Sequence, residues 1–181
     1  MSTENRTAPD NAEWECDLVT RSGYRFHVRP ARDEDEEALD RFFTHVSPDD
    51  LRFRFLTSVV HVPHETIAAL THVDHRKTEN FLAMDPDGTM VGSAMIGADD
   101  KLEVAEVAVS IHEDYKGRGI GWMLLDHAAA YARARGIKKL QSIESRDNHA
   151  AIELEREMGF TAHACPGEPG LVLVESVLNG G

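Results

Sequence analysis

The feature that most constrains this 181-residue chain is a β-branched apolar segment, 106–111, that leads through a short acidic turn into a glycine-rich loop. A long helical pattern follows, so the stretch predicts a strand, a loop and a helix in that order. Glycines at 117, 119 and 121 leave backbone N–H groups unshielded at a helix start, where amides are unpaired and the helix dipole is positive. This indicates an anion site suited to phosphate. A tight turn that needs glycine only for its geometry is the alternative.

The spacing of the loop narrows the choice of phosphate ligand. A dinucleotide fingerprint needs G-x-G-x-x-G after a parallel strand, and a Walker loop needs G-x-x-x-x-G-K-[ST]; neither fits. The loop resembles the Q/R-x-x-G-x-G/A loop of the GNAT superfamily of acetyl-CoA-dependent N-acyltransferases. That resemblance implies that the pantetheine arm of acetyl-CoA lies along one strand and its pyrophosphate binds the loop. The residues so implied are Val107, Ala108 and Val109 for the arm, and Lys116, Gly117, Arg118, Gly119, Ile120 and Gly121 for the pyrophosphate.

A second segment, 148–160, resembles the N-x-x-A-x-x-L-Y-x-x-x-G-F helix of the same family. Asn148 would then contact the pantetheine or the attacking amine, although a plain N-cap role explains it equally well. The chain departs from the family at Glu155, where the family commonly has a tyrosine that protonates the leaving CoA thiolate. We expect Glu155 to be a solvated helix residue, so that water or the amine's own proton serves the thiolate.

Within the family, three segments are most similar to bacterial protein lysine acetyltransferases that modify acyl-CoA synthetases: 29–31, 47–48 and 105–109. That resemblance implies that Glu106 is the catalytic base. The chemistry requires one, because a lysine amine with a pKa of about 10.4 is mostly protonated at neutral pH. Strand alternation places Glu106 on the face opposite Val107 and Val109, which we expect to pack in the core. A merely solvated strand glutamate is the alternative.

The fold class predicted is α/β (α+β), the GNAT fold, with a mixed, mostly antiparallel central sheet of six to seven strands flanked by helices. Three successive strands, 81–84, 90–96 and 102–111, are joined by short turns, which indicates an antiparallel meander rather than a Rossmann domain. The predicted organisation is a flexible N-terminal arm, 1–22, with a short strand near 16–20, followed by the GNAT domain, 23–181. A late apolar strand near a sheet edge makes a homodimer a further expectation.

Composition limits the functional classes. The hydrophobic fraction of 41% and charged fraction of 28% are typical of one globular domain. No apolar run approaches the roughly 20 residues that span a bilayer, and no signal-peptide pattern begins the chain, so we expect a cytoplasmic protein without a membrane partner. The net charge of −13 argues against nucleic acid and favours cationic substrates. Histidines 61, 64, 72 and 75 lack a metal-ligand motif, so no metal is expected.

The sequence thus predicts an enzyme that moves the acetyl group of acetyl-CoA to an amine, preferably a protein lysine side chain. Two alternatives stay open. One is a CoA-binding sensor or interaction module with weak catalysis, which the absent tyrosine favours and Glu106 opposes. The other is an acetyltransferase for small-molecule amines, because the acceptor surface would come from the helices within 33–72.

Overall fold

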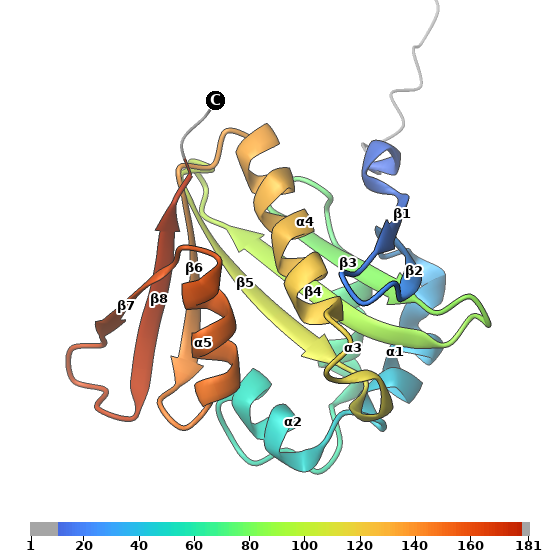
Figure 1. Cartoon of the computed structure of the whole chain (residues 1–181), viewed down its shortest axis with the longest axis horizontal. Helices are drawn as coiled ribbons and strands as arrows, with labels where there is room; N and C mark the ends of the chain where they lie inside the picture. Colours follow the sequence, from blue (N-terminus) through green and yellow to red (C-terminus); the bar gives the residue numbers. More distant parts are fainter. Residues whose placement is uncertain (1–10, 179–181) are drawn as a thin grey trace, which may run out of the picture.

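The computed structural model describes residues 11–178, which form an eight-stranded sheet flanked by helices (Figure 1). The strands are β1 (Cys16–Val19), β2 (Arg25–Pro30), β3 (Thr78–Met84), β4 (Met90–Ala98), β5 (Val104–Ile111), β6 (Lys139–Ser145), β7 (Thr161–Ala164) and β8 (Leu171–Val177). The α-helices are α1 (Glu36–Phe43), α2 (Pro48–Phe55), α3 (His64–Thr71), α4 (Ile120–Ala134) and α5 (His149–Glu157). Three short 3₁₀ helices join them: η1 (Ala12–Trp14), η2 (Asp33–Asp35) and η3 (Glu113–Tyr115).

The sheet has the order β1-β2-β3-β4-β5-β6-β8-β7. Among the described strands, β5 and β6 are the parallel pair and the other neighbours are antiparallel. The parallel pair arises because α4 carries the chain back to the start of β6. The predicted mixed, mostly antiparallel sheet is therefore confirmed, with eight strands instead of six to seven.

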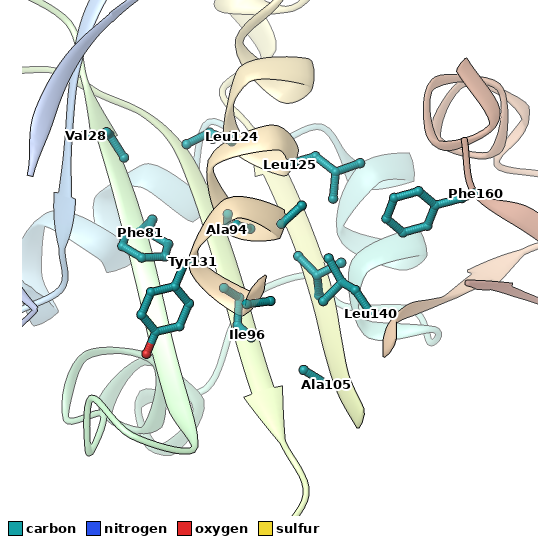
Figure 2. Packing of buried hydrophobic residues seen from close by; sticks show 14 of the residues in the cluster. Val28, Phe81, Ala94, Ile96, Ala105, Leu124, Leu125, Tyr131, Leu140 and Phe160 are labelled. Atoms are coloured by element: carbon teal, nitrogen blue, oxygen red, sulfur yellow. The ribbon is translucent and has the colours of Figure 1, made fainter. Parts of the chain in front are cut away.

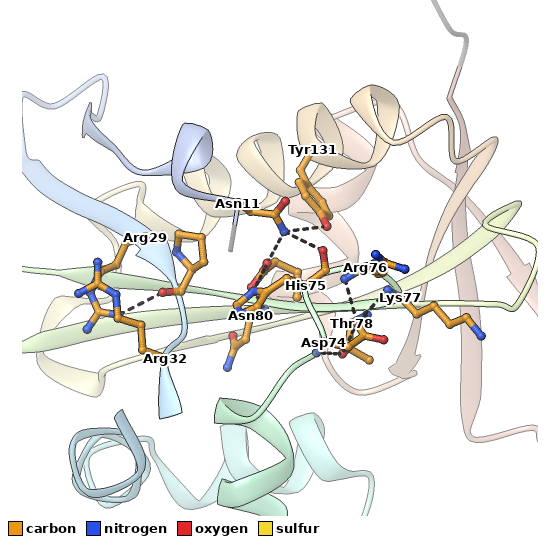
Figure 3. A network of polar contacts seen from close by, with 12 residues as sticks. Asn11, Arg29, Arg32, Asp74, His75, Arg76, Lys77, Thr78, Asn80 and Tyr131 are labelled. Atoms are coloured by element: carbon orange, nitrogen blue, oxygen red, sulfur yellow. Dashed lines mark hydrogen bonds and ion pairs between the residues drawn. The ribbon is translucent and has the colours of Figure 1, made fainter. Parts of the chain in front are cut away.

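Residues 11–22 are packed onto the domain, so the predicted arm is wrong for this part of it. The predicted short strand is β1, which pairs antiparallel with β2. Asn11 is buried, and its Nδ2 donates to Glu79 Oε2 at 2.6 Å and to the His75 carbonyl at 3.0 Å (Figure 3). Arg135 donates to Asn11 Oδ1 at 2.6 Å. These contacts fix the segment to α4 and β3; residues 1–10 of the predicted arm lie outside the described residues.

The two faces of the sheet carry separate cores. On β3, Phe81 packs in a cluster with α4, while the neighbouring Leu82 packs in a second cluster with α1 and α3, as alternation requires. Figure 2 shows Leu124, Leu125 and Tyr131 of α4 against the strands of the first face. The sheet is thus covered by α4 on one face and by α1 and α3 on the other (Figure 1).

The last strand does not lie at a sheet edge. β8 pairs with β6 on one side and with β7 on the other, so the edge strand at this end is the four-residue β7. The homodimer was expected because the apolar segment 171–174 was placed near a sheet edge. That reason does not hold, because the strand that contains it, β8, already has a neighbouring strand on each side.

Candidate active site

The site forms where β5 and β6 diverge. The two strands pair only from Val104 to Glu106 and from Lys139 to Gln141, although β5 continues to Ile111 and β6 to Ser145. Beyond the paired segment the strands separate, and α2 contacts both of them near the opening (Figure 1). Beyond Glu106, β5 no longer pairs with β6. The backbone groups on that edge of β5 are therefore available to a ligand in the gap.

A cavity of about 330 Å³ occupies this opening. It is lined by α2, the second half of β5, the glycine loop with the start of α4, β6 and α5. Its volume lies in the range of small-molecule sites, which are typically about 300–1,000 Å³. Of the residues predicted for cofactor binding, the cavity is lined by Val107, Ala108, Val109, Lys116, Gly117, Gly119, Ile120, Gly121 and Asn148. Arg118 and Glu106 lie outside the lining.

The loop before α4 presents an uncapped helix N-terminus. Gly117 and Gly119 have φ values of +78° and +89°, which glycine adopts without strain. Gly119 is the N-cap of α4, and no side chain of residues 11–178 caps the helix there. The first amides of α4 have no intrahelical acceptor, so they and the positive helix dipole are available to an anion. His112 supports the loop, because its Nδ1 accepts from the Asp114 amide at 3.1 Å.

Two cations, Lys116 and Arg118, lie at the loop. Lys116 Nζ is 2.6 Å from Asp50 Oδ2, so the loop is joined to α2 by an ion pair. The Arg118 guanidinium lies 4.6 Å from the ring centre of Tyr115 and 5.3 Å from that of Tyr24. These cation–π contacts hold the guanidinium beside the loop. The rings carry no net charge, so they do not neutralise the arginine.

Sequence reasoning missed a third cation, Arg21. Its guanidinium lies 5.4 Å from the ring centre of Trp122 in the first turn of α4. The preceding Thr20 approaches Gly119, and Ser22 Oγ donates to the Arg118 carbonyl at 3.3 Å. This contact was missed because residues 1–22 were predicted to be a flexible arm. The short strand expected near 16–20 was the available signal, because a strand that pairs with the sheet also places the residues that follow it.

Glu106 lies at the last paired position before the strands diverge. Its side chain is exposed, and its Oε1 accepts from Gln141 Nε2 at 3.5 Å. Val107 is buried and Val109 packs against the same core, so alternation directs Glu106 to the other face, as predicted. Glu106 therefore stands beside the cavity, one residue before its lining begins.

Asn148 performs the capping role and a second one. Its Oδ1 accepts from the Ala151 amide at 3.4 Å, which caps α5, and its Nδ2 donates to Glu144 Oε2 at 3.2 Å. Ser142 Oγ donates to the other oxygen of Glu144 at 2.6 Å. The side chain of Glu144 is thus held at the cavity by donors from β6 and α5.

Glu155 corrects the sequence prediction. It is 5% exposed, not solvated, and it lines the cavity. Its Oε2 has no hydrogen-bond partner among residues 11–178. Burial raises the pKa of Glu155 to about 9, and the charge of Glu144 adds to the shift. The carboxyl group is therefore protonated at neutral pH.

Arg54 of α2 also lines the cavity, and sequence reasoning did not select it. Burial lowers its pKa, and the charge of Glu144 opposes that shift. Its guanidinium lies 4.9 Å from the ring centre of Phe55. The period-two alternation of 51–56 gave no sign that this arginine would face a cavity, because the segment is helical.

The Acetyltransferase (GNAT) family model matches residues 36–160. The chain belongs to this family. An acetyltransferase of Pseudomonas aeruginosa, PA5475, is 30% identical over 149 residues, which are 81% of this chain and 80% of the relative. The GNAT protein described here is accordingly an acetyl-CoA-dependent N-acetyltransferase.

Solved structures agree with this fold. The GNAT domain of S. lividans PAT has a TM-score of 0.86 at 28% identity, over 92% of this chain and 98% of that one. The acetyltransferase yncA of Salmonella typhimurium, solved with its cofactor acetyl-CoA, has a TM-score of 0.69 at 21% identity, over 85% of this chain and 94% of that one.

Within residues 11–178, no three His, Cys, Asp or Glu side chains are arranged to hold a metal ion. In the same part of the chain, none of the helices combines the length and apolar character that crossing a membrane requires.

Proposed function

We propose that this GNAT protein acetylates the side-chain amine of protein lysine residues and that Glu106 removes the proton from the attacking amine. The observation that carries the proposal is the placement of Glu106, an exposed carboxylate at the point where β5 and β6 separate beside the cavity. A base at this position can be reached from the surface by a long, flexible side chain.

The electrostatics favour a cationic acceptor. The chain has a net charge of −13, which attracts lysine-rich surfaces and raises encounter rates at low salt. The exceptions are Arg21, Lys116 and Arg118 around the glycine loop, where a polyanionic cosubstrate needs positive charge. We infer that acetyl-CoA enters from the loop side, with its pyrophosphate on the amides that begin α4, and that the amine approaches on the side of Glu106.

The reaction then needs little from the protein beyond position and proton transfer. Val107, Ala108 and Val109 line the cavity and would hold the pantetheine arm along the unpaired part of β5. Glu106 accepts a proton from the ammonium group, and the free amine attacks the thioester carbonyl. Acyl-CoA synthetases are the protein acceptors that the sequence resemblance suggests.

The test is acetyl transfer by purified protein to an acyl-CoA synthetase, to lysine peptides and to polyamines, with acetylated sites read by mass spectrometry. We expect lysine acetylation that depends on acetyl-CoA. Exclusive acetylation of polyamines would replace protein lysine by a small-molecule acceptor. Tight acetyl-CoA binding without transfer to any of the three would instead identify the sensor alternative.

A further inference from the structure

The structure contains a buried carboxyl group that packing alone does not explain. Glu155 is 5% exposed on a helix whose neighbouring Glu153 and Arg156 are exposed. It lines the cavity, and its Oε2 has no hydrogen-bond partner in the part of the chain described, 11–178. A buried polar atom without a partner is costly, and such atoms persist mainly where a function needs them.

Glu144 faces Glu155 and is itself well anchored. Both oxygens of Glu144 accept hydrogen bonds, one from Ser142 Oγ at 2.6 Å and one from Asn148 Nδ2 at 3.2 Å. This arrangement suits a carboxylate, which accepts hydrogen bonds at both oxygens. Glu155 is buried and Glu144 is half-buried, and two facing carboxyl groups cannot both be charged at low cost, so one of them keeps a proton.

The proton belongs mainly to Glu155. Burial raises the pKa of Glu155 most, the charge of Glu144 and a side-chain hydrogen bond with Glu144 raise it further, and a hydrogen bond with Ser142 opposes the rise. From α2, Arg54 faces the same cavity, and its charge acts on Glu144. Asp50 and Lys116 also line this cavity, where they neutralise each other. Glu155 thus offers an O–H donor inside the cavity at neutral pH.

We propose that Glu155 is the proton donor to the CoA thiolate that leaves during acetyl transfer, with Glu144 as a positioning residue that keeps the proton on Glu155. This inference rests on the proposed function. It assigns a catalytic role to a carboxyl group that lines the same cavity as Val107–Val109, the segment of β5 that does not pair with β6 and beside which the thioester would lie.

The amine nitrogen, freed of one proton by Glu106, forms a C–N bond to the acetyl carbonyl carbon. The tetrahedral intermediate then loses the second proton on its nitrogen to solvent and collapses: the C=O bond re-forms, the C–S bond breaks with its electron pair on sulfur, and the Glu155 O–H gives its proton to that sulfur. Glu155 is then a carboxylate beside Glu144, an unfavourable state that draws a proton from solvent when CoA leaves. The proton on Glu106 returns to solvent.

The test compares Glu155→Gln with wild type and with Glu153→Gln, an exposed carboxylate on the same helix. The readouts are kcat at saturating substrates between about pH 6 and 10, the Kd of acetyl-CoA, and the carbonyl stretch of a protonated carboxyl group in infrared difference spectra. In wild type, kcat should fall at alkaline pH as Glu155 ionises, and the infrared band should be present.

Glu155→Gln should lose the alkaline fall and the infrared band, and its kcat at neutral pH should drop by about 10- to 100-fold, while the Kd changes less than about twofold. Glu153→Gln should match wild type. Glu144→Gln should move the alkaline fall to lower pH, because the charge that holds the proton on Glu155 is gone. A purely structural Glu144 would not shift the profile.

Two results overturn the inference alone: an active wild type without the infrared band, or a Glu155→Gln variant that keeps both neutral kcat and the alkaline fall. A wild type that acetylates no acceptor overturns the proposed function, and the acid role with it. The two failures are thereby distinguishable, because the first requires an active wild type.

Discussion

Lys116 Nζ and Asp50 Oδ2 lie 2.6 Å apart, so an ion pair joins the glycine loop to α2, and both elements line the cavity. The Lys116 side chain is 51% exposed and that of Asp50 26%, and the pair is therefore partly screened by solvent. Its effect on stability is small, at most about 1 kcal/mol. The pair matters for binding, because Asp50 neutralises the Lys116 charge that could otherwise pair with a phosphate group of the cosubstrate.

Replacing Asp50 by Asn should therefore tighten acetyl-CoA binding by a few-fold, because Lys116 becomes free to pair with phosphate. Calorimetry measures the change. The matched control is Asp100→Asn, which breaks the Lys77–Asp100 pair, also 2.6 Å long, away from the cavity lining. The control should leave the Kd unchanged, and weaker binding in Asp50→Asn would mean that Asp50 positions Lys116 for the cosubstrate.

The glycine loop gives a second prediction through Gly119. Its φ is +89°, and an added Cβ would stand 3.3 Å from Thr20 Cβ. Gly119→Ala should cost about 1 kcal/mol of unfolding free energy from backbone strain and should weaken acetyl-CoA binding roughly tenfold or more, because the methyl group disturbs the amides that hold phosphate.

Gly88→Ala provides the control for that strain. Gly88 has nearly the same φ, +90°, and an added Cβ has no atom within 4 Å among the described residues. We expect a similar loss in denaturant midpoint with no change in Kd. Equal loss of affinity in both variants would attribute the Gly119 effect to general destabilisation.

The pKa of Glu155 makes stability depend on pH. The pKa of Glu155 is about 9 in the folded state, against the ordinary value of 4.5 that applies to the unfolded chain. Between these two pH values the folded state holds a proton that the unfolded state has released, so the free energy of unfolding falls as pH rises across that window. Glu155→Gln has no such group. Its advantage in unfolding free energy over wild type should grow with pH by at most about 1.4 kcal/mol per unit.

Urea unfolding at pH 5 and pH 8 measures this difference. Glu155→Gln should lose activity while it gains stability, which is the trade-off expected where a destabilising group serves an active site. A difference that is independent of pH would contradict a proton held on Glu155.

The sequence predicted the local parts of this site well. The strand, glycine loop and helix around residues 106–121 depend on glycine geometry and on helix-start chemistry, both readable from neighbouring residues. The capping role of Asn148 was predicted for the same reason, and α2 was correctly preferred over a strand because Ser47 caps it, accepting from the Asp50 amide at 3.2 Å.

What the sequence did not reveal depends on long-range packing. Glu155 reads as a solvated helix residue until Glu144 and Ser142 of β6 are placed against it. The short strand near 16–20 was predicted, but its pairing with β2, which brings Arg21 onto α4, was not. The position of β8 between β6 and β7 likewise follows from pairing, which local pattern does not determine.

The central claim is that Glu106, at the point where β5 and β6 separate, is the base for amine attack. The most direct test is kcat for Glu106→Gln, with the Kd of acetyl-CoA measured in parallel and Glu103→Gln, an exposed carboxylate three residues earlier, as control. The amide keeps the shape and removes the proton acceptor, so kcat should fall by roughly 10²–10⁴ while the Kd stays within about twofold of wild type. Full activity in Glu106→Gln, or an equal loss in Glu103→Gln, would contradict it.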